Sequence, residues 1–172
     1  LVDQLLALAL ADEAQHTLEQ KPVAVDVLVR EAVLRFLPRA DAAGVDLGAR
    51  GVEQPVWAIA NEALMEGVLN NLLDNALRYG DGRTPIEVQV DPSEGPDGAA
   101  GVTLTISNRP GMAAWPEPSK VFQKYYRSTG AQSQSGTGLG LFLVASLAKR
   151  IGAYCRYAPD ERRVRFVLWL PI

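Results

Sequence analysis

The sequence predicts an α+β fold in which one mixed sheet carries helices on one of its faces. Residues 86–90 and 102–106 alternate apolar and polar side chains, as half-buried strands do. Residues 61–79 have apolar side chains at helical spacing and are followed by Gly80, as is typical of an amphipathic helix. Because the expected strands come in pairs with helices between them, we expect a single sheet with the helices layered on it.

The remaining expected elements are shorter or interrupted. Further helices are expected at residues 1–20, 27–43 and 139–150. Further strands are expected at residues 23–25, 45–47, 55–59, 153–158 and 164–170. Asp26 is a candidate N-cap and Pro38 a candidate break or kink of the helix over 27–43. Trp57 and Trp169 are expected in or near the core.

Two segments lack a periodic pattern. Residues 91–98 have the composition of a plain hairpin loop, and no function is assigned to them. Residues 108–137 are rich in Pro, Gly, Ser and Gln. So long an irregular stretch within a domain is usually either a functional loop or a disordered one.

Composition and charge narrow the class of protein. A length of 172 residues is typical of one domain. The composition, with 48% hydrophobic and 22% charged residues, excludes a disordered chain. No run of about 18 apolar residues occurs, so we expect no membrane span in this stretch. We also expect it to make no membrane contact. The only cysteine, Cys155, excludes an internal disulfide and a multi-cysteine zinc cluster.

The charge is unevenly distributed. The net charge of −3 speaks against a nucleic-acid partner. Residues 118–159 nevertheless contain six Lys or Arg and no Asp or Glu. Such a basic segment in an acidic chain indicates either an anion site or a solvated surface.

The first candidate site lies in the helix expected over 61–79. At about 100° per residue, Asn71, Asn75 and Arg78 fall within a narrow arc, with Tyr79 beside them. A neutral carboxamide oxygen suits a magnesium ion that is also held by phosphates and water, and an arginine can grip a phosphate. The alternative is a polar rim on an ordinary helix. Asn70 and Asp74 point further outward, and we expect both to be solvated.

The second candidate site is the segment Gly136-Thr137-Gly138-Leu139-Gly140-Leu141, just before a helix. Alternating glycines let backbone N–H groups approach an anion, and the helix N-terminus adds a favourable dipole. The segment is neither a Walker sequence nor a dinucleotide fingerprint, because it lacks the Lys-Ser/Thr pair and the third glycine. A flexible hinge is the alternative.

Together these segments resemble the ATP-binding catalytic domain of sensor histidine kinases, in the wider family shared with gyrase, heat-shock chaperone and mismatch-repair ATPases. Residues 71–79 resemble its asparagine box, residues 121–128 its phenylalanine box and residues 136–141 its second glycine box. The resemblance implies that residues 21–172 form the catalytic domain. Residues 1–20 would be the end of a dimerisation and phosphoacceptor helical hairpin.

The resemblance implies a two-layer α/β sandwich that holds ATP and Mg²⁺ under a nucleotide lid. Asn75 would coordinate the metal, Asn71 would lie near the phosphates, Arg78 would contact them and Tyr79 would pack on adenine. Phe122 would anchor the lid. The lid candidates for phosphate contact are Lys124, Arg127, Gly136, Thr137, Gly138, Leu139 and Gly140.

The first glycine box of this chain departs from the family pattern. The family has Asp-x-Gly-x-Gly, and its aspartate accepts a hydrogen bond from the adenine amino group. Here the aligned residues run from Ser107 through Asn108, Arg109 and Pro110 to Gly111. Either Ser107 or Asn108 stands at the adenine, and neither has a carboxylate charge. Gly111 is a further candidate contact.

The resemblance also implies a reaction and partners. Asn71 stands where the hydrolysing members have a glutamate, and an amide is no general base, so phosphoryl transfer is favoured over hydrolysis. The acceptor histidine is expected outside this stretch, because the surroundings of His16 do not resemble an acceptor box. The parent protein would be a homodimer anchored in a bacterial inner membrane that phosphorylates a response regulator. The alternative is a degenerate module with a regulatory role.

Overall fold

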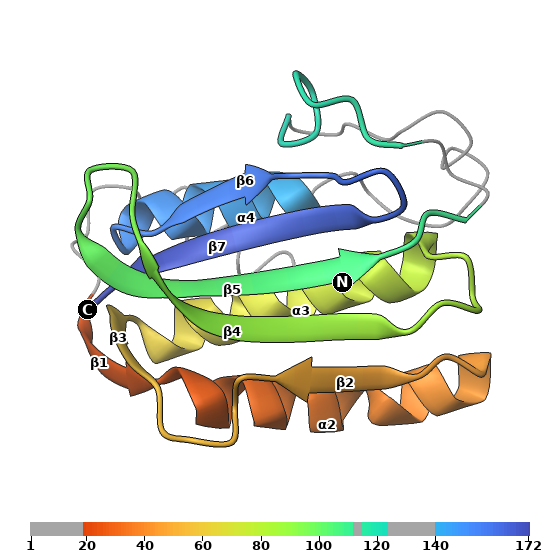
Figure 1. Cartoon of the computed structure of the whole chain (residues 1–172), viewed down its shortest axis with the longest axis horizontal. Coiled ribbons are helices and arrows are strands. Elements are labelled where there is room, and N and C mark those ends of the chain that lie inside the picture. The colour runs from red at the N-terminus through yellow and green to blue at the C-terminus, as the bar shows by residue number, and fades with distance from the viewer. Residues whose placement is uncertain (1–18, 112–114, 124–139) are drawn as a thin grey trace.

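A five-stranded mixed sheet is the frame of the computed structural model, which describes residues 19–111, 115–123 and 140–172 (Figure 1). The strand order is β2 (Leu47–Arg50), β4 (Ile86–Glu94), β5 (Ala100–Asn108), β7 (Val164–Pro171) and β6 (Tyr154–Tyr157). β2 and β4 run parallel, and the other neighbours are antiparallel. A separate antiparallel pair joins β1 (Lys21–Ala24) to β3 (Trp57–Ala60).

The helices lie behind the five-stranded sheet in Figure 1 and form the second layer. They are α2 (Val25–Ala43), α3 (Glu62–Tyr79) and α4 (Gly140–Arg150). No described helix covers the opposite face of the sheet. The expected α+β class, a mixed sheet with helices on one face, is confirmed. The helix expected over residues 1–20 lies outside the described residues, except for its last two positions.

Alternation along the strands separates the two faces of the sheet. Leu104 and Ile106 of β5 and Leu168 of β7 point to the helices and are no more than 1% exposed. Thr103 and Thr105, which alternate with these residues along β5, point to the open face and are only half-buried. A shift of one residue in register would exchange these two sets, so burial of the apolar set fixes the register.

Helix α3 fills the centre of the helical layer. The side chain of Asn61 caps its start by accepting a hydrogen bond from the Leu64 N–H at 3.1 Å. At its end the Gly80 N–H donates to the Ala76 carbonyl at 3.0 Å. The side of α3 that faces the sheet is buried and consists of Leu64, Met65, Val68, Leu69, Leu72, Leu73 and Ala76. Each large apolar side chain buried in this way stabilises the fold by about 1.5–3 kcal/mol.

The start of α2 differs from the expectation. Ala24 is the N-cap residue, and Asp26 lies in the first turn, so the expected cap is wrong. The buried carboxylate of Asp26 accepts from the Val56 N–H of a distant segment at 2.9 Å and pairs with Arg30, one turn on in the same helix, at 2.9 Å. Burial opposes ionisation, but these bonds outweigh it and hold the pKa of Asp26 below its ordinary value. The helix continues through Pro38.

Two further expectations are wrong. β4 continues to Glu94 and pairs with β5 up to Ala100, so the loop is shorter than residues 91–98. The half-buried indole of Trp169 fills the space beside this hairpin: a Cβ at Gly95 would lie 2.6 Å from its ring. Trp57 is 58% exposed and not a core residue.

None of the described helices is long and apolar enough to cross a membrane.

Candidate functional site

The last two turns of α3 carry the expected polar arc. Asn71, Asn75, Arg78 and Tyr79 are all half-buried in this helix. Asn71 donates from Nδ2 to the Gly67 carbonyl at 2.9 Å, one turn back, which leaves its side-chain oxygen available. The carboxamide of Asn75 makes no hydrogen bond to another described residue, so its oxygen is available to a ligand.

The neighbouring polar residues of α3 bind to α2. Asp74 Oδ1 lies 2.9 Å from Arg39 Nη1, and Asp74 Oδ2 lies 3.4 Å from Arg78 Nε. Asn70 accepts from Arg35 at 2.9 Å. Both residues point outward as expected, and there they meet arginines of α2, while the side chain of Asp74 stays 26% exposed. Because Asp74 bridges two guanidinium groups with its two oxygens, it links the orientation of Arg78 to α2.

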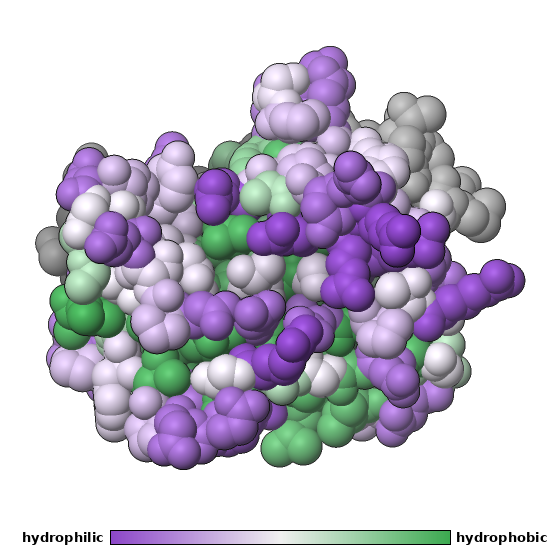
Figure 2. Space-filling model, in the orientation of Figure 1, coloured by the Kyte–Doolittle hydropathy of each residue, from purple (hydrophilic) through white to green (hydrophobic). Residues whose placement is uncertain are grey.

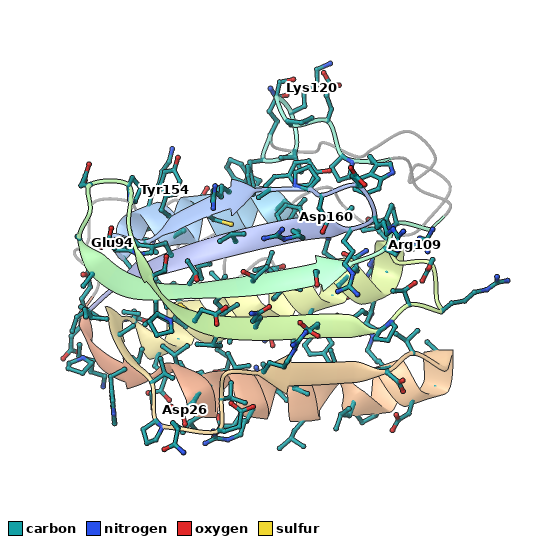
Figure 3. All side chains as sticks on the ribbon, in the orientation of Figure 1. Asp26, Glu94, Arg109, Lys120, Tyr154 and Asp160 are labelled. Atoms are coloured by element: carbon teal, nitrogen blue, oxygen red, sulfur yellow. The ribbon has the colours of Figure 1, made fainter. Side chains whose placement is uncertain are left out.

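The segment after β5 is joined to the end of α3 by a backbone seam. The Asp81 N–H donates to the Arg109 carbonyl at 2.9 Å, and the Gly111 N–H donates to the Tyr79 carbonyl at 3.0 Å. Figure 3 shows Arg109 beside this end of the helix. A Cβ at Gly111 would collide with the carbonyl oxygen of Gly80 and lie 3.1 Å from Asp81 Cα. The two backbones can approach this closely only because residue 111 has no side chain.

The strand pleat separates Ser107 from Asn108. Both are buried, at 7% and 4% exposure. Ser107 belongs to the open face, where its hydroxyl accepts from Arg163 Nη1 at 3.5 Å. Asn108 follows it on the helix face, and its Nδ2 lies 3.7 Å from the position that a Cβ of Gly80 would take. Of the two residues, Asn108 therefore lies on the side of the sheet that carries Asn75 and Tyr79.

The loop after α3 is held by Asp81. Its carboxylate accepts from the N–H groups of Arg83 and Thr84, at 2.9 and 2.8 Å, and from the Thr84 hydroxyl at 2.7 Å. Burial opposes ionisation of this group, but the hydrogen bonds from Thr84 and Arg83 outweigh it and lower the pKa of Asp81. The fixed loop keeps the Asp81 N–H in place for the seam.

The start of the phenylalanine box packs on the core, as expected for Phe122. Val121 is 1% exposed, and the Phe122 ring meets the edge of Phe166 with centroids 5.9 Å apart. This contact anchors residues 115–123 on β7. The candidates Lys124, Arg127, Gly136, Thr137, Gly138 and Leu139 lie outside the described residues, and Gly140 is the first residue of α4.

The donor set for a metal is sparse. Within the described ranges no three His, Cys, Asp or Glu side chains come together in a way that could hold a metal ion. A single carboxamide oxygen, such as that of Asn75, fits Mg²⁺ when phosphates and water supply the other ligands. Sequence reasoning missed the bridge formed by Asp74, although its position one turn before Arg78 was a signal for such a pair.

Comparison with known proteins shows that the chain is similar in sequence to parts of sensor proteins. The swarming motility regulation sensor protein RssA of Serratia marcescens is 33% identical over 170 residues, which cover 98% of the chain and 35% of that protein. The probable sensor histidine kinase HK of Mycobacterium tuberculosis is 31% identical over 154 residues, covering 90% and 38%. The chain thus spans about a third of the length of these curated relatives.

Solved structures share the fold. Full-length ShkA in complex with AMPPNP gives a TM-score of 0.72 at 21% identity, over 99% of the chain and 35% of ShkA. The mycobacterial sensor histidine kinase MprB gives 0.66 at 22% identity, over 89% of the chain and 97% of the solved chain. The two-layer fold implied by the resemblance is thereby confirmed.

The family model described as "Histidine kinase-, DNA gyrase B-, and HSP90-like ATPase" matches residues 60–172. The match begins just before α3 and includes the polar arc, the seam and α4. The resemblance seen in the sequence is confirmed, and the chain belongs to the histidine kinase-, DNA gyrase B- and HSP90-like ATPase family, whose ATP-binding domain it carries.

Proposed function

We propose that this chain is the catalytic part of a sensor histidine kinase and transfers the γ-phosphate of ATP to a histidine outside the chain. The observation that carries the proposal is the polar arc of Asn71, Asn75, Arg78 and Tyr79 on α3, with Asn108 on the same side of the sheet across the seam. Two relatives of the chain are named as a sensor protein and a probable sensor histidine kinase. ShkA, which shares the fold, was solved with AMPPNP.

The adenine contact is assigned to Asn108. Its carboxamide can accept a hydrogen bond from the adenine amino group and donate one to a ring nitrogen. Ser107 points to the open face, so its hydroxyl is directed away from α3. Tyr79 offers its ring to the base, and Gly111 allows the backbone approach that places Asn108 beside α3. A neutral acceptor gives a weaker bond than the family's carboxylate.

The phosphate contacts are assigned to the polar arc and the lid. The Asn75 oxygen would hold Mg²⁺, which when bound neutralises charge on the phosphate oxygens. Arg78 would contact the phosphates, with Asn71 beside them. The family resemblance adds the lid contacts Lys124, Arg127, Gly136, Thr137, Gly138, Leu139 and Gly140.

The groups around the polar arc favour transfer to an imidazole over hydrolysis. Asn71 has no basic oxygen that could activate water. The nearby carboxylate of Asp74 is bound to two arginines. A neutral histidine needs no such base, so positioning and charge neutralisation suffice.

Residues 1–20 would be the end of the dimerisation hairpin of the parent protein, and residues 21–172 its catalytic domain. The parent would be a membrane-anchored homodimer that passes the phosphate to a response regulator.

The proposal is tested with the full-length parent protein and γ-labelled ATP. Acid-labile label on the protein, lost when Asn75 is replaced by alanine, is expected. A matched control is Asn70→Ala, which removes a carboxamide that faces α2. A folded parent that binds ATP but acquires no label would contradict kinase activity and favour a regulatory module. Steady phosphate release without label would instead indicate an ATPase.

A further inference from the structure

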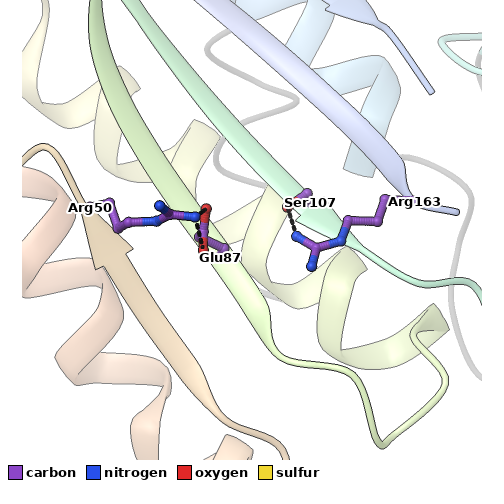
Figure 4. A network of polar contacts seen from close by, with 4 residues as sticks. All are labelled: Arg50, Glu87, Ser107 and Arg163. Carbon is purple, nitrogen blue, oxygen red and sulfur yellow. Dashed lines mark hydrogen bonds and ion pairs between the residues drawn. The ribbon is translucent and has the colours of Figure 1, made fainter. Parts of the chain in front are cut away.

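The sheet face that no described helix covers holds a polar trough, and Figure 4 draws four of the residues that line it. Figure 2 shows this face, with hydrophilic residues gathered over the turn between β6 and β7. The part of the trough beside β5, β7 and β6 is lined by Thr105, Ser107, Arg156, Arg163, Arg165 and Val167. We call this part the arginine trough. The proposed nucleotide site lies on the opposite face, so the two are separate.

Strand register fixes the arrangement of the arginine trough. Arg165 stands opposite Ser107, while Val167 stands between Thr105 and Arg156. Directly paired residues have their side chains on the same face, with Cβ atoms about 5 Å apart. Two hydroxyl groups on β5 therefore face a row of guanidinium groups on and beside β7 and β6.

None of the three arginines forms an ion pair with a carboxylate among the described residues, although the Asp160 carboxylate interacts electrostatically with Arg163 and Arg165. The side chains of Arg156 and Arg165 make no ion pair or hydrogen bond there. Arg163 reaches only the hydroxyl of Ser107, at 3.5 Å (Figure 4). The Ser107 hydroxyl accepts this bond, so its own proton can still be donated to an anion.

Three carboxylates line the whole trough, and two of them, Glu87 and Asp91, lie on the side of Arg50. Glu87, on the far side of the trough, binds Arg50 at 2.9 Å. Asp160, in the turn between β6 and β7 (Figure 3), accepts from the backbone N–H groups of Arg162 and Arg163 at 2.8 and 2.7 Å. Backbone hydrogen bonds leave the negative charge of Asp160 in place, so this side of the trough holds three guanidinium groups against one carboxylate, on a chain whose net charge is −3.

We propose that the arginine trough binds an extended acidic segment of a partner protein, with carboxylates at alternate positions. Residues two apart on a strand lie about 6.6–6.8 Å apart on one face. Arg165 lies in β7 and Arg163 lies just before this strand, two residues away, so their guanidinium groups can meet alternate carboxylates of an extended segment. Arg156 pairs with Val167, two residues along β7 from Arg165. One small anion at Arg163 and Arg165 would therefore leave Arg156 without a bound carboxylate. Ser107 donates to a carboxylate between the arginines.

The test is fluorescence anisotropy of a labelled peptide of alternating glutamate and threonine, with the full 172-residue chain at low salt. Arg163→Gln and Arg165→Gln are each expected to weaken binding about 2–5-fold, and both together more than about 5-fold. Arg162→Gln is the matched control, because its side chain lies in the same turn but outside the trough, and it is expected to bind like the wild type. The midpoint of urea unfolding should stay unchanged in all of these variants.

Several outcomes would overturn the proposal. One is equal binding of a peptide with glutamine in place of glutamate, and another is unchanged binding by the folded double variant. Displacement by inorganic phosphate at the peptide's own concentration would reassign the trough to a small oxyanion. Equally tight binding of a single-stranded oligonucleotide would indicate a general polyanion surface. The nucleotide site is not involved, so none of these results bears on the proposed kinase function.

Discussion

Replacing Gly111 with alanine is expected to open the seam between α3 and the segment after β5. The new Cβ would collide with the carbonyl oxygen of Gly80 and press on Asp81 Cα, 3.1 Å away. Both neighbours are backbone atoms and cannot rotate aside. The chain must therefore separate at the two hydrogen bonds that link Asp81 to Arg109 and Gly111 to Tyr79.

The size of the effect follows from these contacts. Overpacking against a rigid neighbour costs about 1–3 kcal/mol. Each of the two seam hydrogen bonds, at 2.9 and 3.0 Å, contributes about 0.5–1.5 kcal/mol, and the substitution would stretch both. We expect Gly111→Ala to lower the free energy of unfolding by about 2–4 kcal/mol in total. Asn108 would also move away from α3, so nucleotide affinity should fall by about 10-fold or more.

The assay is urea unfolding combined with calorimetric titration of an ATP analogue. Gly48→Ala is the matched control: a Cβ there meets nothing within 4 Å. Its unfolding free energy is expected to stay within about 0.5 kcal/mol of the wild type. If Gly111→Ala matched Gly48→Ala in both stability and affinity, the close backbone approach at the seam would be refuted.

Three further predictions concern single side chains. Asn108→Ala should weaken binding of an ATP analogue about 10-fold, whereas Ser107→Ala should leave it within about 2-fold, as measured by calorimetry; the reverse order would assign adenine to Ser107. Asp74→Asn should reduce analogue affinity about 3–10-fold through loss of the Arg78 orientation, with less than about 1 kcal/mol change in unfolding free energy; unchanged affinity would rule out that role. The lowered pKa of Asp26 means that its ionised form stabilises the fold above the ordinary value of 3.8, and that this stability is lost as pH falls through the folded pKa. The destabilisation by Asp26→Asn in urea unfolding should therefore shrink from pH 7 to below about pH 4, and a constant difference would contradict this.

Most of the fold was predictable because its elements have strong local patterns. The helix expected over 61–79 is α3, one residue shorter because Asn61 is its cap. The central strands were expected over 86–90 and 102–106, and both are longer in the structure. Their extension past Val90 rests on cross-strand pairing of Asp91–Glu94 with Ala100–Thr103, which no local pattern indicates. Asp26 was misassigned for a similar reason, because its partner Val56 is distant in sequence.

The candidate site was predictable in its composition but not in its geometry. Helical spacing placed Asn71, Asn75 and Arg78 on one arc without any tertiary information. The choice between Ser107 and Asn108 depends on which face of β5 each residue occupies, and a one-residue slip exchanges the faces. The steric demand at Gly111 depends on contact with α3, far away in the sequence. The lid residues lie outside the described part of the chain, so their assigned roles stay predictions.

The proposed function requires that the variant glycine box, with Asn108 in place of a carboxylate, still binds ATP. The most direct measurement is calorimetric titration of the chain with a non-hydrolysable ATP analogue and Mg²⁺, with the corresponding GTP analogue as control. We predict micromolar binding that is selective for adenine and is lost in Asn75→Ala. Absence of binding by a chain whose fold is verified would contradict the claim and favour a regulatory module without catalysis.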